Sequence, residues 1–510
     1  MIKTALISVS DKEGIVGFAK ELGKLKIKII STGKTAKLLR QNKIKTTLVS
    51  EITKFPEMLG GRLKSLHPNI FAGILADRKN RKHMNELKKL RISQIDMVVV
   101  NFYPFDEAIK KTGKIREIIE NIDIGGPSLV RAAAKNFRNV LVVIDKNDYN
   151  EIIEKIKHKK IDDAEKARLA AKAFLQTARY ETIIGRYFAE NFIDEMFPRI
   201  YNFTFKKIQD LRYGENPHQK AAFYKSYWIN ETCVSTAKQL QGKELSYNNI
   251  LDANDAFELV KDFKEPTAAV IKHTNPSGAA TSPKIDEAYK KAYETDTTSA
   301  FGSVVALNRP CNAEIAKMMK PLFVEVVICP KFEKNALKIL KEKKNLRLLE
   351  TGPIERNYKS HDMRRVVGGL LVQTRQYPDL SQKNLKLVTK RKPTREEIKD
   401  MMFAWKVNKH VKSNSIVLAK GNVTVGIGAG QMSRVDAAKL AVMKSEGKSN
   451  GSVMSSDAFF PFRDGVDEAA KAGITAIIQP GGSIRDKEVI EAANEYNIAM
   501  VFTGIRLFRH

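Results

Sequence analysis

One dipeptide carries two side chains that can move protons and stabilise charge. Lys272 and His273 follow Ala268–Ile271, an apolar run typical of a buried strand, and precede Asn275-Pro276, which favours a bend. An imidazole exchanges protons near neutral pH and an ammonium stabilises negative charge. Because neighbouring strand residues face opposite sides, both side chains reach one ligand only if the backbone bends at this strand end, as Asn275-Pro276 would allow. A histidine alone would more simply be a core residue.

Two loops near the N-terminus place hydroxyl groups and lysines directly after predicted strands. Residues 8–12 follow one strand and residues 31–35 follow the next. Backbone amides at helix N-termini bind phosphate, so both loops suit a nucleotide phosphate. Gly33-Lys34-Thr35 does not complete a P-loop, because Lys28 occupies a position that requires glycine. Ordinary helix capping is the alternative for either loop.

A further group of polar residues in the same region mixes cations, an aromatic hydroxyl and a carboxylate. Taken singly, a tyrosine at a strand end usually packs, and an arginine is usually a solvated charge. Together they favour a site for an anion or a reacting group. They are Arg62, Lys64, His67, Tyr103, Asp123, Arg131 and Lys135.

Residues 1 to 145 alternate short β-branched runs with helical patterns. Such alternation indicates a mostly parallel sheet covered by helices, with its ligand crevice at the carboxyl ends of the strands. The loops described above should therefore meet at that edge. The predicted strands are Ala5–Val9, Ile27–Ile30, Thr46–Val49, Met97–Val100 and Val140–Ile144.

The helical pattern of residues 150–191 ends at residues 197–203, where a proline and aromatic residues interrupt it. We therefore expect two domains, residues 1–195 and residues 200–510. The second also mixes strands with helices and is long enough for two similar α/β units. Its predicted strands include Ala268–Ile271, Val304–Leu307, Val324–Ile328, Ile416–Leu418 and Ala476–Ile478.

In order and spacing, the segments of both domains resemble the bifunctional purine-biosynthesis family that joins phosphoribosylaminoimidazolecarboxamide (AICAR) formyltransferase to inosinate (IMP) cyclohydrolase. For residues 1–195 the resemblance implies a methylglyoxal-synthase-like fold and the cyclohydrolase activity. The residues implied to hold the phosphate are Ser10, Lys12, Ser31 and Thr35, with Arg62 assisting. Those implied to surround the closing ring are Lys64, Tyr103, Asp123 and Lys135.

For residues 200–510 the resemblance implies two cytidine-deaminase-like α/β subdomains that transfer a formyl group from 10-formyltetrahydrofolate to AICAR. The product, FAICAR, is then closed to IMP with loss of water. It implies that His273 accepts or shuttles a proton, that Lys272 stabilises charge near the folate leaving nitrogen, and that Asn414 orients His273 or the formyl oxygen. The implied substrate contacts are Arg212, Tyr213, Glu325 and Arg506 for the nucleotide and Phe301 for the folate.

The zinc signature of the deaminases is incomplete in this chain. The residue two positions after His273 is Asn275 rather than glutamate, and Pro310-Cys311 has no second cysteine at the required spacing. We therefore expect no catalytic metal.

The chain is strongly basic, with 88 Lys and Arg against 58 Asp and Glu and a formal net charge of +30. Such an excess occurs in nucleic-acid-binding proteins, but here lysines alternate with acids along predicted helices, as in residues 338–344. We expect a solvated surface and no nucleic-acid partner. No apolar run approaches the ~20 residues of a membrane span, and the N-terminus does not suit a signal peptide. The expectation is a cytoplasmic enzyme and, because the family's active site includes residues from both subunits, a homodimer.

Overall fold

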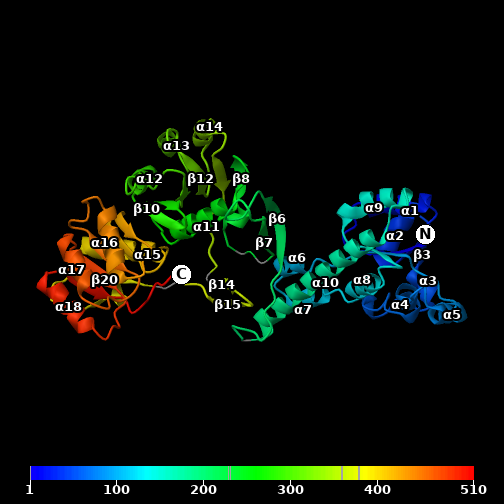
Figure 1. The fold of residues 1–510 in the computed structure, drawn as a ribbon. Helices are drawn as coiled ribbons and strands as arrows, with labels where there is room; N and C mark the ends of the chain where they lie inside the picture. Colours follow the sequence, from blue (N-terminus) through cyan, green and yellow to red (C-terminus); the bar gives the residue numbers. More distant parts are fainter. Residues whose placement is uncertain (1, 194, 228, 230, 358–359, 377–379) are drawn as a thin grey trace. The chain divides into compact units, whose positions relative to one another are not determined.

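The computed structural model describes residues 1–510 except 1, 194, 228, 230, 358–359 and 377–379. The chain divides into two compact units, Met1–Thr204 and Phe205–His510 (Figure 1). They are called unit 1 and unit 2 below.

Unit 1 is built on a five-stranded sheet in the order β3-β2-β1-β4-β5, in which every neighbouring pair is parallel. Its strands are buried on both faces by helices, which is why they read as continuous apolar runs in the sequence. The predicted parallel sheet is confirmed; Val49, predicted to end a strand, instead begins a short helix. The strands are β1 (Thr4–Val9), β2 (Lys28–Ser31), β3 (Thr46–Leu48), β4 (Met97–Asn101) and β5 (Leu141–Val143).

The helices of unit 1 connect and cover these strands. The longest, α10 (Asp163–Phe192), begins where the Asp162 side chain accepts a hydrogen bond from the Glu165 backbone, and it packs Leu169 and Ala173 into the core. The others are α1 (Ile15–Lys24), α2 (Gly33–Gln41), α3 (Val49–Thr53), α4 (Pro68–Leu75), α5 (Arg81–Lys89), α6 (Phe105–Lys111), α7 (Ile115–Glu120), α8 (Gly125–Lys135) and α9 (Tyr149–Lys157).

Unit 2 contains one twelve-stranded sheet made of two halves with the same topology. In each half an antiparallel hairpin, β9–β10 or β17–β18, is followed by an antiparallel neighbour and then by strands parallel to that neighbour. The halves join where β10 pairs with β18. This duplication confirms the prediction of two α/β subdomains. From one edge to the other the strands are β16 (Lys386–Leu387), β21 (Ala499–Phe502), β20 (Ala476–Gln479), β19 (Val453–Ser456), β17 (Ile416–Lys420), β18 (Val423–Gly428), β10 (Asn275–Thr281), β9 (Thr267–Lys272), β11 (Ser303–Leu307), β12 (Val324–Cys329), β13 (Arg347–Glu350) and β8 (Lys238–Gln241).

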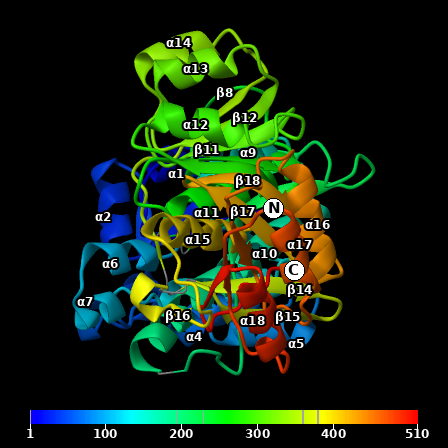
Figure 2. The ribbon, with the colours of Figure 1, turned by 90° about the vertical axis from the view of Figure 1, so that its left-hand side faces the viewer.

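The two faces of this sheet are covered differently. Alternate strand residues point to opposite faces, so Ile271 packs in a core shared with α11 (Tyr247–Lys261) and α15 (Arg395–Asn408), whereas Val270 packs in a core on the other face. Figures 1 and 2 show α11 and α15 over the middle of unit 2, with the remaining helices in two groups. Those groups are α12 (Ile285–Tyr293), α13 (Ala313–Met319) and α14 (Lys334–Leu340), and α16 (Arg434–Lys444), α17 (Asp464–Lys471) and α18 (Asp486–Glu495).

Two hairpins in unit 2 form separate two-stranded sheets. One pairs β6 (Phe205–Leu211) with β7 (Ala221–Ser226), and the other pairs β14 (His361–Val366) with β15 (Gly369–Thr374). No helix within the described ranges is long and apolar enough to cross a membrane.

Candidate active sites

In unit 1 the predicted loops lie at the carboxyl edge of the parallel sheet, as the sequence indicated. A cavity of about 600 Å³ opens there beside the N-terminus of α2, whose first amides are not capped by a side chain. Uncapped helix amides are donors for an anion. The cavity is lined by Ser31, Thr32, Gly33, Lys37, Arg40, Gln41, Leu48, Val49, Ser50, Phe55, Glu57 and Lys64.

The loop that carries Ser10 and Lys12 is fixed by Asn101, at the end of the neighbouring strand. The Asn101 side-chain oxygen accepts hydrogen bonds from the Ser10 backbone at 2.6 Å and from the Asp11 backbone at 2.9 Å. Burial lowers the pKa of Lys12, and the nearby Lys34 and Lys64 ammonium groups lower it further. Three cations therefore gather beside the loop. Asn101 was not among the predicted site residues, although its place at the end of β4, next to β1, is a signal for such a role.

The hydroxyl groups of Ser31 and Thr35 are buried and contact β1. Ser31 Oγ donates to the Ile7 carbonyl at 2.7 Å, and Thr35 Oγ1 donates to the Val9 carbonyl at 3.0 Å. These bonds fix the start of α2 against the sheet, and both residues direct their hydroxyl hydrogens into the protein.

Asp123 is the predicted carboxylate of this region. It accepts a hydrogen bond from the Gly126 backbone at 2.8 Å. Burial raises the pKa of Asp123 above its ordinary value, although the Gly126 amide, the Lys64 ammonium and the Tyr103 amide act in the opposite direction. The structure thus brings Asp123, Lys64 and Tyr103 together.

A tyrosine of α10 supports the Asp123 loop from behind. The hydroxyl of Tyr180 accepts a hydrogen bond from the Asp123 backbone at 2.8 Å and donates to the Asn121 carbonyl at 3.3 Å. Its ring packs on Phe102, next to Tyr103, with 5.0 Å between ring centroids. Tyr180 was not predicted, because nothing in its local sequence pattern marks a contact with a loop so far away in the chain.

Two predicted residues lie outside this group. Arg62 is exposed and forms an ion pair with Glu120. Lys135 is in the last turn of α8, whose first residue adjoins Asp123, so it lies about 15 Å further along the helix axis. The structure does not bring Lys135 to Asp123 of the same chain.

In unit 2, Lys272 and His273 form part of a two-residue hairpin turn. Lys272 pairs with Asn275, which leaves His273 and Thr274 as the turn, with φ angles of 51° and 63°. The backbone therefore does bend at this strand end, but through His273 and Thr274 rather than through Asn275-Pro276, which belongs to β10. Turns with two left-handed residues match the twist of a hairpin, and this turn makes the bend two residues earlier.

The ammonium group of Lys272 is held over the start of β11. It donates to the Phe301 carbonyl at 2.9 Å and to the Gly302 carbonyl at 3.2 Å. The Phe301 ring is 68% exposed and lies 5.0 Å, centroid to centroid, from Phe323. The cation therefore adjoins an exposed aromatic surface that can flank a planar ligand.

Asn414 is oriented by a buried ion pair. Its side-chain oxygen accepts from Arg434 Nη2 at 2.8 Å, and its amide nitrogen donates to the Gln431 carbonyl at 2.9 Å. Arg434 in turn pairs with the fully buried Asp457, which also accepts from Ser413 Oγ at 2.5 Å. Arg434 and Asp457 were not among the predicted site residues.

Asn275 connects the His273 turn to the segment that carries Asn414. Its amide nitrogen donates to the His273 carbonyl at 3.2 Å, and its oxygen accepts from the Lys412 backbone at 3.0 Å. The three predicted catalytic residues of unit 2 therefore lie on adjoining segments.

The remaining predicted residues of unit 2 lie on elements around this centre. Glu325 is near the start of β12, beside β11, and accepts from Arg347 at 2.7 Å. Leu507, next to Arg506, donates its backbone N–H to the Asp457 carbonyl at 2.8 Å. Arg212 stacks on Tyr213, and their loop reaches α11 through a hydrogen bond from Asn248 to the Glu215 carbonyl, at 3.3 Å.

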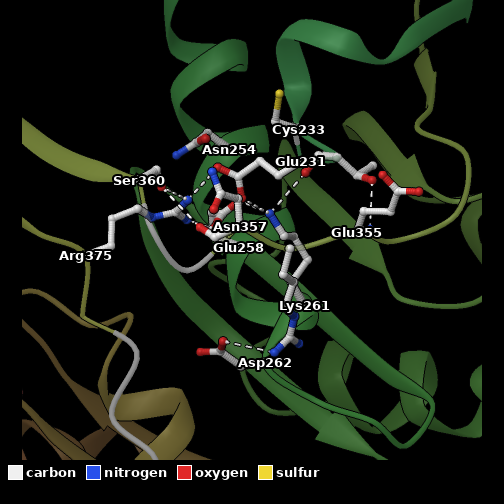
Figure 3. Close-up of polar contacts among 12 residues, drawn as sticks. Glu231, Cys233, Asn254, Glu258, Lys261, Asp262, Glu355, Asn357, Ser360 and Arg375 are labelled. Carbon is white, nitrogen blue, oxygen red and sulfur yellow. Dashed lines mark hydrogen bonds and ion pairs between the residues drawn. The ribbon is translucent and has the colours of Figure 1, made fainter. Parts of the chain in front are cut away.

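A second, partly buried network holds the base of the β14–β15 hairpin (Figure 3). Arg375 donates to Glu231 at 2.5 Å, to Glu258 at 2.6 Å and to Ser360 at 3.0 Å. Lys261, only 2% exposed, contacts the same two carboxylates. Two positive and two negative groups thus clamp both ends of the hairpin onto α11.

Among the described residues, no group of three or more His, Cys, Asp or Glu side chains could hold a metal ion.

Comparison with known proteins identifies the family. The model of the family described as AICARFT/IMPCHase bienzyme matches residues 133–444, and that of the MGS-like domain matches residues 14–128. Bifunctional purine biosynthesis protein PurH of Acetivibrio thermocellus is 52% identical over 514 residues, and that of Caldicellulosiruptor saccharolyticus is 51% identical over 514 residues. Each alignment covers 100% of both chains. The chain therefore belongs to the AICARFT/IMPCHase bienzyme family, and it formylates AICAR from 10-formyltetrahydrofolate and cyclises FAICAR to IMP.

Proposed function

We propose that the two reactions are divided between the two units, with formyl transfer in unit 2 and ring closure in unit 1. The observation that carries the proposal is the turn at the end of β9. It presents His273 beside Lys272, whose ammonium group is fixed by two carbonyls next to exposed aromatic rings. Unit 1 has its own cationic cavity and carboxylate, so neither group of residues needs the other.

In unit 2 the amine of AICAR attacks the formyl carbon of the folate, forming the new C–N bond. His273 accepts the proton that the amine loses, and Lys272 stabilises charge and supplies a proton to the folate nitrogen as its bond to the formyl carbon breaks. Asn414, fixed by Arg434, orients His273 or the formyl oxygen. The products are FAICAR and tetrahydrofolate.

The proposed substrate contacts are residues that lie near Lys272, His273 and Asn414. Phe301 flanks the folate, since its backbone carbonyl accepts a hydrogen bond from Lys272 and its side chain is exposed. The nucleotide is held by the polar residues around the same centre. They are Arg212, Tyr213, Glu325 and Arg506.

In unit 1 the carboxamide nitrogen of FAICAR attacks its own formyl carbon, and water leaves. Ser10, Lys12 and the amides of α2 hold the phosphate, Ser31 and Thr35 fix that helix, and Arg62 assists binding. Lys64 and Tyr103 donate hydrogen bonds to the oxygen atom on which negative charge develops. Asp123 accepts a proton or orients the group that carries it. The raised pKa of Asp123 suits such an exchange.

The test is a double dissociation. Lys272→Ala or His273→Ala should abolish tetrahydrofolate release from AICAR and formyl-folate while leaving cyclisation of supplied FAICAR unchanged. Lys64→Ala should abolish cyclisation and spare formyl transfer. Lys420→Ala is a matched control, because Lys420 ends β17 as Lys272 ends β9 and its ammonium donates to the Asn450 carbonyl at 3.0 Å. Loss of both reactions in one folded variant would contradict the division.

We also infer a homodimer, supported by the β14–β15 hairpin. An isolated two-stranded hairpin is marginally stable in water, yet this one carries the exposed side chains of Val367 and Leu371 on a base held by partly buried ion pairs. Lys135 supports the same inference. It is too far from Asp123 of its own chain, and a second copy can supply it to the ring-closing site.

Sedimentation of the Val367→Glu/Leu371→Glu variant tests the dimer. The wild type should sediment as a dimer at micromolar concentration and the variant as a monomer, because two carboxylates would be buried in the interface. Leu90→Glu, a change at a similarly exposed leucine, should leave the dimer intact. A monomeric wild type would refute the inference.

We place the enzyme in the cytoplasm without a nucleic-acid partner. Cys233, Cys311 and Cys329 are free thiols, as expected in a reducing compartment. Fractionation of cells would test the location. Binding to DNA or RNA at physiological salt would count against the solvated-surface explanation of the charge.

A further inference from the structure

A carboxylate of α11 holds the turn formed by His273 and Thr274. Asp252 Oδ1 accepts a hydrogen bond from the backbone N–H of Thr274 at 2.7 Å. Burial raises the pKa of Asp252, while the Thr274 amide and the nearby His273 act against that rise. A partly buried carboxylate thus faces the backbone of the turn that carries the imidazole.

The second subdomain contains the same contact between a helix aspartate and a hairpin turn. Asp400 of α15 accepts hydrogen bonds from the backbones of Gly421 and Asn422, at 2.8 Å and 2.6 Å, in the turn between β17 and β18. In both subdomains the aspartate lies on the helix before the hairpin, and a lysine ends the first strand. The Asp–turn contact is therefore a feature of the duplicated fold.

The two turns differ in the residues that adopt positive φ angles. Gly421 and Asn422, at φ 62° and 57°, are residue types that accept this conformation readily. His273 and the β-branched Thr274 occupy the equivalent positions at φ 51° and 63°, where Thr in particular is strained. The first turn keeps an unfavourable pair of residues, and it is the turn that carries the imidazole.

We propose that Asp252 is a positioning residue for formyl transfer, which holds the strained turn so that the His273 imidazole stays beside Lys272. The proposal rests on the functions proposed above for Lys272 and His273. Asp252 contacts the backbone of the turn and acts through His273. Asp400 makes the same contact with the Gly421-Asn422 turn, which carries no proposed catalytic residue. It therefore provides the control for what such a contact contributes to stability alone.

The experiment compares Asp252→Ala and the milder Asp252→Asn with Asp400→Ala in the full-length protein. For each variant kcat and KM of formyl transfer, cyclisation of supplied FAICAR and the thermal midpoint are measured. Asp252→Ala should lower kcat of formyl transfer about 10- to 100-fold with a smaller change in KM, because a misplaced catalytic group slows the chemical step. Asp400→Ala should lower the thermal midpoint at least as much and leave kcat within about twofold.

A rescue separates positioning from stability. Glycine adopts positive φ angles without strain, so Thr274→Gly added to Asp252→Ala should recover part of the lost kcat. Equal losses of kcat in Asp252→Ala and Asp400→Ala, or no recovery in a folded double variant, would overturn the proposal. His273→Ala is assayed alongside. If His273→Ala keeps formyl transfer, the proposed function fails; if it is inactive while Asp252→Ala keeps full kcat, only the positioning proposal fails.

Discussion

In unit 1 the candidate residues follow the carboxyl ends of parallel strands, whereas in unit 2 they gather at the amino ends of β11 and β12. The difference comes from β9, which is antiparallel to β11, so that Lys272 at its carboxyl end adjoins Ser303 at the start of β11. Carboxyl edges suit phosphate because helix N-termini meet there. The centre of unit 2 is instead formed by a hairpin turn and side chains. The rule that ligands bind at the carboxyl ends of parallel strands therefore does not predict its position.

The two centres are also fixed by different forces. In unit 1 neutral groups position the loops, as the Asn101 amide and the Tyr180 hydroxyl do, and the ion pair between Lys146 and Asp11 beside them is exposed to solvent. In unit 2 a buried ion pair positions Asn414, and a carboxylate holds the His273 turn. Breaking a buried charge pair costs more than removing a neutral hydrogen bond. Substitutions behind the unit 2 centre should therefore have the larger effects.

The largest combined loss of stability and activity is expected for Asp457→Asn. The change leaves Arg434 buried without its counter-charge, which costs about 3–5 kcal/mol, and frees Asn414 from its orientation. Formyl transfer should fall by about 100-fold or more. Thermal unfolding and both half-reactions are measured on one preparation, and cyclisation of supplied FAICAR should persist. Unchanged formyl transfer, or an equal loss of cyclisation, would contradict the contrast between the units.

The next largest effect is expected for Asp123→Asn, with opposite signs for activity and stability. Cyclisation should fall about 10²–10⁴-fold through loss of the proton-transfer group, and formyl transfer should be unaffected. Because burial raises the pKa of Asp123, its ionised form is destabilised in the fold at every pH above the ordinary pKa of aspartate. The variant should therefore unfold at a higher temperature at neutral pH. This gain should vanish as the pH falls and the wild-type carboxyl becomes protonated; a loss of stability at neutral pH would refute this account.

Much of this arrangement was predictable from local sequence. The strands of unit 1 read directly from their apolar runs, because a sheet buried on both faces leaves an unbroken signal, and residues 8–12 and 31–35 follow from where those strands end. Lys272 and His273 also stood out at a strand end.

The supports behind the sites were not predictable in this way. Asp252 and Asp400 look like ordinary helix residues, and their contacts with hairpin turns depend on how a helix crosses the sheet. The bend at His273-Thr274 was missed because neither residue favours positive φ angles. A local sequence pattern indicates which secondary structure its residues prefer. The aspartate contacts and the His273-Thr274 turn depend instead on tertiary contacts, which override those preferences.

The smallest effect is expected for Tyr180→Phe, which removes a hydroxyl and its two neutral hydrogen bonds behind Asp123. Burial raises the pKa of Tyr180 to about 12, so its hydroxyl stays protonated and supports the loop throughout the working pH range. Its loss should lower kcat/KM for cyclisation about three- to tenfold at every pH, without affecting formyl transfer. Tyr187→Phe, the same change at another buried tyrosine of α10, should have no effect. Parallel pH–rate profiles of the wild type and both variants check this. A loss as large as that from Asp457→Asn would mean that neutral supports in unit 1 matter as much as buried charges in unit 2.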